Sequence, residues 1–182
     1  MTGGAGDDTY VVDGLRDMVI ERPGEGIDTV LSVTAKRVLP AHVENLTLNA
    51  SVAVTGVGNE LANLLKGNSN ANTLDGGGGD DILIGGLGRD LFVFRTLDER
   101  GDSINDFAPG QDWMDLRGVL RSTGYTGDHP VHDGYLRFVE VDAGTEVRLD
   151  PDGLGDNPDV VLVTLRGLAV TGLQNGPSLF FA

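Results

Sequence analysis

The chain has no cysteine, few aromatic residues and no long apolar run. Without cysteine it can form no disulfides, and it is compatible with any redox compartment. No stretch approaches the roughly 20 apolar residues of a membrane span, so membrane insertion is not expected. The first residues, MTGGAGDD, lack the basic region and the apolar run that mark an N-terminal secretion signal.

Basic residues are also scarce. The sequence has 13 Lys and Arg against 28 Asp and Glu, a formal net charge of -15 over 182 residues. This charge disfavours binding to nucleic acids and docking on anionic membranes. A compact form of the chain would repel itself unless cations neutralised it. Because 40% of the residues are hydrophobic, we expect conditional folding rather than permanent disorder.

Glycine, in contrast, is abundant, and it recurs with a nine-residue period. Residues 76–84 and 85–93 read GGGGDDILI and GGLGRDLFV. Both fit G-G-x-G-x-D-x-U-x, where U is a large apolar residue. Residues 3–11 are a third full copy, and residues 23–31 match with proline in place of the first glycine. Such a period indicates a solenoid, whose units bury their apolar residues only against their neighbours.

Two degenerate copies precede the tandem pair. In residues 58–66 and 67–75, asparagine replaces some glycines and the aspartate. The apolar position nevertheless keeps its register through all four copies, and it is occupied by Leu65, Leu74, Leu83 and Phe92. These residues are therefore predicted to line the core.

The repeats resemble the calcium-binding nonapeptide of RTX (repeats-in-toxin) proteins. Residues 102–116, DSINDFAPGQDWMDL, are similar to the stretch that follows the last repeat in secreted serralysin-type proteases. The resemblance implies an all-β chain, a parallel β-roll stacked on calcium with a C-terminal antiparallel β cap. The roll is expected at 1–94, with degenerate coils at 32–75. The cap and a type I secretion signal region are expected at 95–182.

The expected cap has recognisable elements after Leu116. The segment LRGVLRSTGY favours one short helix, and YLRFVEV, TEVRL and DVVLVTLRGL are typical of strands. The C-terminal SLFFA is either the last strand of the cap or a recognition signal for export, and the two roles are compatible.

A nine-residue unit suits a six-residue turn and a three-residue strand, so two units make a coil of about 18 residues. Aspartates of turns one coil apart then face each other. Two carboxylates with nearby backbone carbonyls suit Ca²⁺, which takes six to eight oxygen ligands, better than Mg²⁺.

This stacking predicts pairs of side-chain ligands: Asn72 with Asp90, Asn63 with Asp81, and Asp8 with Asp28. For the coil after residues 76–81, the serralysin-like pattern implies two acids, which map to Asp98 or Glu99 and to Asp102. The full predicted set of ligands, carbonyl donors included, is Gly4, Gly6, Asp8, Pro23, Glu25, Asp28, Asn63, Asn68, Asn70, Asn72, Gly76, Gly77, Gly78, Gly79, Asp81, Gly85, Leu87, Asp90, Asp98, Glu99 and Asp102. At the asparagine-bearing repeats, hydrogen-bonded asparagine ladders without metal are an equal alternative. Residues 150–159, DPDGLGDNPD, favour an acidic hairpin turn over a weak calcium site.

The expected function is a calcium-binding RTX module that folds outside the cell and supports type I secretion of an upstream passenger. It is expected to be secreted, to have calcium and the type I exporter as partners, and not to be an enzyme; no H-E-x-x-H zinc motif is present. The alternative is an accessory module that binds a polysaccharide or a surface for an extracellular enzyme or adhesin. A basic groove would favour that alternative, and the net charge disfavours it.

Overall fold

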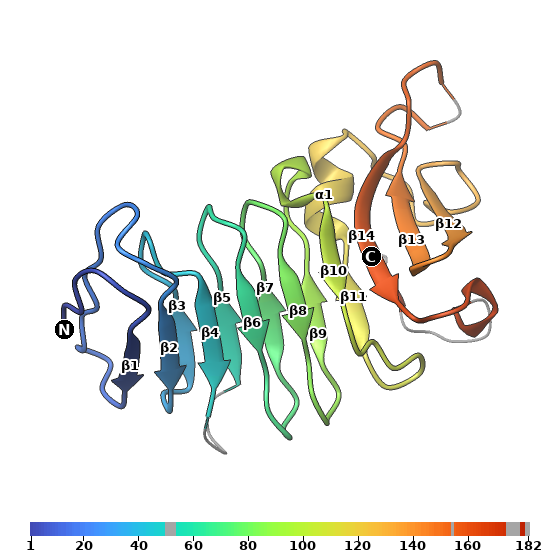
Figure 1. Cartoon of the computed structure of the whole chain (residues 1–182). Coiled ribbons are helices and arrows are strands. Elements are labelled where there is room, and N and C mark those ends of the chain that lie inside the picture. Colours follow the sequence, from blue (N-terminus) through green and yellow to red (C-terminus); the bar gives the residue numbers. More distant parts are fainter. Residues whose placement is uncertain (50–53, 154, 174–178, 181–182) are drawn as a thin grey trace.

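The computed structural model describes residues 1–49, 54–153, 155–173 and 179–180. The strands that wind around the roll are β1 (Thr9–Val12), β2 (Thr29–Ser32), β3 (Lys36–Val38), β4 (Asn45–Leu48), β5 (Thr55–Val57), β6 (Leu64–Lys66), β7 (Thr73–Asp75), β8 (Ile82–Ile84), β9 (Leu91–Val93), β10 (Asp102–Ile104) and β11 (Trp113–Asp115). They lie side by side along the solenoid, with β1 at the left in Figure 1.

The chain alternates between two facing parallel sheets. One sheet begins in the order β1-β2-β4-β6-β8-β10, and the other contains β11-β9-β7-β5-β3. In the central coils Thr55 pairs with Thr73, and Thr73 with Leu91, each step being 18 residues. The first coil is longer, since Thr9 pairs with Thr29. The predicted parallel β-roll is thereby confirmed.

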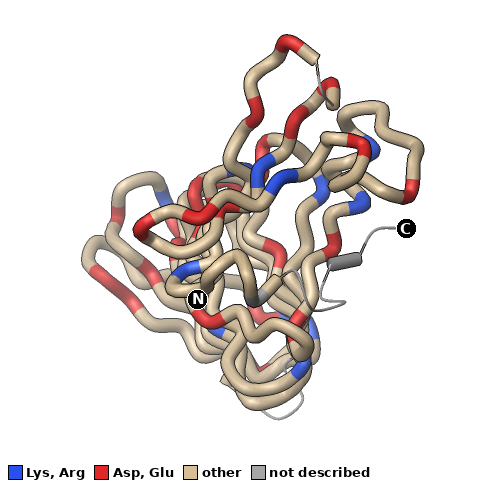
Figure 2. The backbone as a smooth tube through the Cα atoms, turned by 90° about the vertical axis from the view of Figure 1, so that its right-hand side faces the viewer, with Lys and Arg blue, Asp and Glu red and all other residues tan. Residues whose placement is uncertain are grey.

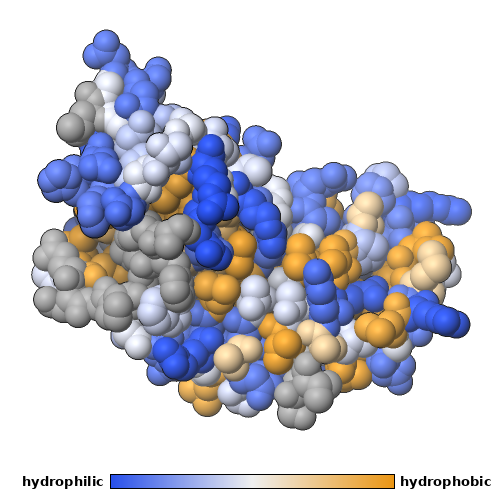
Figure 3. Space-filling view, turned by 180° about the vertical axis from the view of Figure 1, so that it is seen from behind, coloured by the Kyte–Doolittle hydropathy of each residue, from blue (hydrophilic) through white to orange (hydrophobic). Residues whose placement is uncertain are grey.

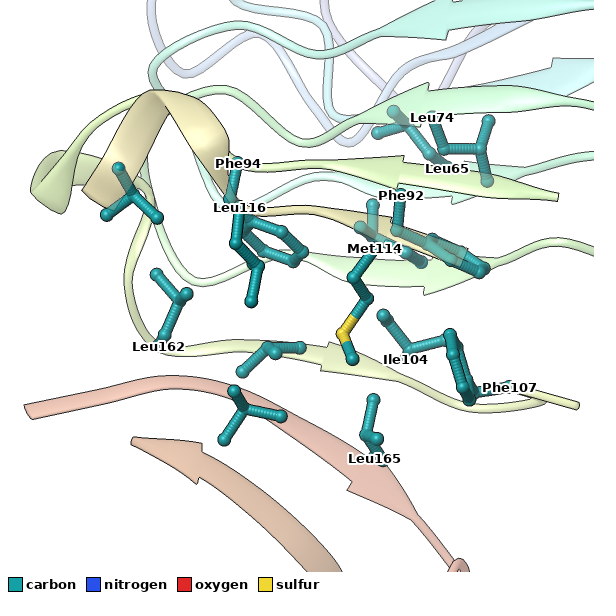
Figure 4. Close-up of a cluster of buried hydrophobic side chains, with 14 of the residues drawn as sticks. Leu65, Leu74, Phe92, Phe94, Ile104, Phe107, Met114, Leu116, Leu162 and Leu165 are labelled. Atoms are coloured by element: carbon teal, nitrogen blue, oxygen red, sulfur yellow. The ribbon is translucent and has the colours of Figure 1, made fainter. Parts of the chain in front are cut away.

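The core is a narrow stack between the two sheets. Leu65, Leu74, Leu83 and Phe92 are all fully buried, as their common register predicts. Figure 4 shows how this stack continues through Phe94, Ile104 and Met114 to Leu162 and Leu165 of the cap. The roll and the cap therefore share one hydrophobic core.

The cap is a three-stranded antiparallel unit made of β12 (Leu136–Val141), β13 (Gly144–Leu149) and β14 (Val160–Arg166). Because β14 pairs in parallel with β10, the cap continues one sheet of the roll and covers its edge. The predicted helix is α1 (Arg117–Ser122). Two 3₁₀ turns, η1 (Leu97–Glu99) and η2 (Val170–Gly172), complete the connections.

The two sheets continue beyond Phe94, where the sequence placed the start of the cap. Strands β10 and β11 pair with β8 and β9, so they form a further coil. At the C-terminus, β15 (Leu179–Phe180) pairs in parallel with β11, while Ser178 and residues 181–182 of the SLFFA tail lie outside the described residues. The division into a roll at 1–94 and a cap at 95–182 stays a prediction.

Apolar side chains are exposed at several places on the surface of the roll. Figure 3 shows apolar side chains between hydrophilic ones on the rear face. Several large apolar residues of the first coil are exposed, among them Val11, Met18, Ile20 and Ile27. No helix in the described ranges has the length and hydropathy needed to cross a membrane.

We expect Leu83→Ala to lower the free energy of unfolding of the calcium-saturated protein by about 2–5 kcal/mol, because it leaves a cavity in the stack. The neighbouring Ile82, on the same strand but 41% exposed, provides the control, and Ile82→Ala should cost less than about 1 kcal/mol. Urea denaturation followed by circular dichroism measures both. Similar losses in the two variants would contradict the inward register.

Candidate calcium sites at the stacked turns

The turns before β8 and β9 owe their shape to glycine. Gly77 and Gly79 have φ angles of +89° and +105°, a region that side chains other than glycine rarely adopt. A Cβ atom on Gly77 would lie 2.3 Å from the carbonyl oxygen of Asn59, one coil earlier. Glycine at this position thus permits both the turn and the close stacking of turn 76–81 on turn 58–63.

The stacked turns are linked by the predicted acidic side chains. In each case a carboxylate Oδ1 accepts a hydrogen bond from the backbone N–H of a residue one coil earlier. The donor and acceptor residues, with their N···O distances, are Asn63 and Asp81 (2.7 Å), Asn72 and Asp90 (2.8 Å), Asp81 and Asp102 (2.9 Å), and Asp8 and Asp28 (2.9 Å). The structure therefore brings together the residues of every predicted pair.

The second oxygen of these carboxylates is in a different situation. The Oδ2 atoms of Asp81, Asp90 and Asp102 are buried, and none has a hydrogen-bond partner among the described residues. All three residues are at most 1% exposed. A buried, ionised carboxylate without a partner is strongly unfavourable. These oxygens are of the hard type that Ca²⁺ selects, so the residues fit a calcium ion.

Burial also changes the protonation of these groups. It raises the pKa of Asp81 and of Asp90 to about 6, and the pKa of Asp102 to about 8. Neighbouring carboxylates raise the pKa values further; the charges of Asp81 and Glu99 act on Asp102. In the metal-free protein the ionised form of each group is thus disfavoured where the turns stack.

Asparagine at the same position behaves differently. The Asn63 side-chain nitrogen donates to the carbonyl oxygens of Val43 (3.2 Å) and Glu44 (3.1 Å), and its Oδ1 accepts from Asn59 N–H (2.8 Å). In turn 67–72 the Asn72 Oδ1 accepts from Asn68 N–H at 2.8 Å. An asparagine amide can link two coils by itself, which supports the ladder alternative at Asn63.

Several predicted carbonyl donors lie between the stacked turns. The carbonyl oxygens of Gly6, Gly85 and Asn70 each point at a glycine of the stacked turn. A Cβ atom on that glycine would lie 2.3 Å from the oxygen for Gly26 and Gly6, 2.2 Å for Gly67 and Gly85, and 2.3 Å for Gly88 and Asn70. Other predicted carbonyls already accept hydrogen bonds between turns: that of Asn68 from Leu87 N–H (3.0 Å), and that of Glu25 from Gly6 N–H. Gly4, Pro23, Gly76 and Gly78 lie in the same turns.

For the coil after turn 76–81, the sequence predicted either Asp98 or Glu99 as the ligand beside Asp102. Glu99 is 8% exposed, and its charge raises the pKa of both Asp81 and Asp102. Asp98 instead lines a surface pocket together with Gly79 and Asp80. Glu99 is thus the acid that lies beside the Asp81–Asp102 pair.

Three further acids that link stacked turns were not among the predicted ligands. Asp112 Oδ1 accepts from Asp90 N–H (3.0 Å), and the carboxylate of Asp106 accepts from the N–H groups of turn 85–90 at Gly85 and Gly86 (2.9 and 2.8 Å). Glu44 Oε2 accepts from Asp28 N–H (2.7 Å). The acids of 102–116 were visible in the sequence, but Asp112 follows Asp90 by 22 residues, so the nine-residue count missed it.

The acidic segment 150–159 forms the hairpin turn that its sequence favours. The Asp150 carboxylate is paired with Arg137 (3.2 Å) and accepts from Asp152 N–H (3.2 Å). Residue 154 of this segment lies outside the described residues. Figure 2 shows that acidic positions recur along the turns of the roll and the cap, with fewer basic positions between them.

A parallel β-roll whose glycine-rich turns stack carboxylates one coil apart defines a calcium-binding solenoid. The profile of the RTX calcium-binding nonapeptide repeat matches residues 57–92 in four copies. The chain therefore carries RTX repeats, which are calcium-binding motifs, and the resemblance of the nonapeptides to RTX repeats is confirmed.

Two known proteins are similar to parts of the chain. An endo-1,3-1,4-beta-glycanase, ExsH, of Rhizobium meliloti (strain 1021) is 44% identical over 66 residues, which are 36% of this chain and 14% of that protein. The solution structure of the AlgE6R3 subunit of the Azotobacter vinelandii mannuronan C5-epimerase aligns with a TM-score of 0.43 at 22% identity, over 99% of this chain and 81% of that one. The chain thus spans only a small part of the glycanase.

We expect the metal-free protein to gain β structure as the pH falls from about 8 towards 4. The raised pKa values of Asp81, Asp90 and Asp102 mean that the folded state binds more protons than the unfolded state in this range, so stability falls as the pH rises through 6 to 8. Circular dichroism in a chelator measures this. Asp102→Asn should flatten the upper part of the profile, and an unchanged profile in that variant would contradict the assignment.

Proposed function

We propose that the chain is a non-catalytic folding module that is unfolded at low calcium, folds on Ca²⁺ outside the cell and supports type I secretion of a passenger joined to it. The observation that carries this proposal is the set of buried Oδ2 atoms at Asp81, Asp90 and Asp102, which have no partner among the described residues. Each requires either a proton or a cation.

The energetic argument follows from the shape of the roll. Each turn brings carboxylates together, and each coil contributes only a few apolar side chains to a narrow core. Calcium that binds only the folded state adds its binding free energy to folding. Sites of the extracellular type fill at roughly 10⁻⁴–10⁻³ M calcium, so the roll would form only where calcium reaches that range.

The proposed ligands are those of the stacked turns. Asp81, Asp102 and Glu99 would hold one ion, with backbone carbonyls of turn 76–81. Asp90 would hold another, with Asn72 on one side or Asp112 on the other. The remaining proposed site pairs Asp8 with Asp28. In this proposal the calcium-dependent part is the roll (1–94) together with the adjoining coil through β11, which carries Glu99, Asp102 and Asp112, and the rest of the region 95–182 closes its end.

Two substitutions in stacked turns test the ligand assignment. Asp81→Asn removes a buried carboxylate at the stacked position, whereas Glu60→Gln removes one negative charge from an exposed residue of the preceding turn 58–63. We expect the first variant to raise the calcium concentration at the midpoint of folding by about tenfold or more, because ligand charge sets affinity. The second should leave the midpoint nearly unchanged. Calcium titrations followed by circular dichroism measure both, and equal shifts would contradict the stacking.

The proposed export role draws on the RTX repeats and on the similarity of residues 102–116 to serralysin-type proteases. Its test is the C-terminal tail. We expect deletion of Leu179 to Ala182 to abolish export of the chain through a type I system. The purified truncated chain should still bind calcium, with some loss of cap stability, because the proposed ligands precede Leu116 in the chain. Normal export of the truncated chain would remove the secretion role from the tail.

A second candidate function is binding of an anionic polysaccharide. A pocket beside β9, β11 and α1 is lined by three arginines, Arg95, Arg117 and Arg121, although the chain as a whole is acidic. One similar protein is named as a glycanase. Two of these cations already have partners, since Arg117 pairs with Asp115 (2.6 Å) and Arg95 with Asp75. Binding of a uronic-acid oligosaccharide at this pocket would favour the candidate.

A further inference from the structure

The first coil places a third acid beside the Asp8–Asp28 pair. Glu21 stands seven residues before Asp28, and the core residue Leu74 stands seven residues before Asp81. In the extended segment before turn 23–28, Val19 and Glu21 are buried while Met18 and Ile20 are exposed. Glu21 is only 7% exposed. A carboxylate thus occupies a position that an apolar residue fills in a later coil.

The three carboxylates converge on one point. One oxygen from each of Asp8, Glu21 and Asp28 lies within 4.8 Å of the other two. An ion that binds oxygens at 2.3–2.6 Å can join atoms up to about 5 Å apart. The Oδ2 atoms of Asp8 and Asp28 and the Oε2 atom of Glu21 are buried and have no hydrogen-bond partner within the described part of the chain.

The surrounding groups hold Glu21 in place. The other Glu21 oxygen, Oε1, accepts hydrogen bonds from the Tyr10 hydroxyl and, at 3.3 Å, from Gly3 N–H. A Cβ atom on Gly3 would lie 2.0 Å from Asp8 Oδ2 and 2.4 Å from the Tyr10 oxygen. Any larger residue at this position would displace the Asp8 carboxylate and the Tyr10 hydroxyl. Tyr10 and Gly3 therefore orient one Glu21 oxygen while the other remains available.

We infer that Asp8, Glu21 and Asp28 form a three-carboxylate calcium site in the first coil. The inference rests on the proposed function for the identity of the ion, but its residues lie outside the repeats matched at 57–92, and Glu21 has no place in the nonapeptide pattern. A site with three carboxylates carries more negative charge than a site in which an asparagine faces an aspartate, such as Asn72 with Asp90. Because ligand charge tunes calcium affinity, this site fills at a lower calcium concentration than the site formed by Asn72 and Asp90.

The alternative is that Glu21 is a neutral carboxylic acid that only bonds to Tyr10. Terbium luminescence separates the two. Tb³⁺ takes the oxygen ligands of calcium, and it emits when a nearby tyrosine or tryptophan transfers energy to it. Tyr10 reports on the first coil, whereas Trp113, next to Asp112, reports on the far end of the roll. The full chain is titrated with Tb³⁺, and Tyr10→Phe identifies the emission that depends on Tyr10.

We expect a Tyr10-dependent emission that saturates before the Trp113 emission and is displaced by calcium. Glu21→Gln should weaken the Tyr10-dependent binding at least about tenfold, while the control Glu60→Gln, at an exposed position, leaves it unchanged. A Tyr10-dependent titration that is identical in Glu21→Gln overturns the site. An emission that Tyr10→Phe does not alter overturns it as well, and this result does not require the Glu21 variant to fold.

The Trp113 emission keeps this test independent of the proposed function. If the Trp113 signal and calcium-induced β structure persist while the Tyr10 signal is absent, the first-coil site fails and the calcium-folding proposal stands. If neither signal nor calcium-induced folding occurs, both fail. Persistence of the Trp113 signal in Glu21→Gln also shows that the roll has folded in that variant.

Discussion

The structure depends on one contact, in which a carboxylate links two consecutive coils through only one of its two oxygens. One oxygen accepts a backbone N–H from the preceding coil, as Asp81 does from Asn63 and Asp102 from Asp81. The other oxygen is buried without a partner among the described residues. The hydrogen bond sets the register of the turns, and the second oxygen makes that register unfavourable unless a proton or cation is present. Fold and ion binding are therefore two aspects of one contact.

The choice between aspartate and asparagine determines whether a contact between two stacked turns leaves a carboxylate oxygen that requires a proton or a cation. Asn63 makes the same link between coils with its own amide, donating to two carbonyl oxygens of the preceding coil. It needs no counter-charge, so the degenerate coils can stack as ordinary polar turns. Under the proposed function, the acidic contacts on either side, at Asp28 and at Asp81, are the ones that respond to calcium.

The regular part of the fold could be predicted from the sequence because every coil there has the same length. The apolar register of Leu65, Leu74, Leu83 and Phe92 and the pairs one coil apart follow from counting in nines. Counting in nines fails where the connection between two strands is longer. Asp112 was missed because it follows Asp90 by 22 residues instead of 18. Glu21 was hidden for another reason: its proposed role depends on the inward direction of its side chain, and the nonapeptide pattern places an apolar residue at that position.

The eighteen-residue repeat of the central coils also limits how such a gene can change in length. Turns at 76–81 and 85–90 lie on opposite edges of the roll because one nonapeptide carries the chain from one sheet to the other. A duplication of one nonapeptide would move every later turn to the wrong edge, next to turns with which it shares no register. A duplication of two would add a complete coil and leave all contacts in place. Natural variation in roll length should therefore occur in pairs of repeats, and a designed roll should be lengthened in the same unit.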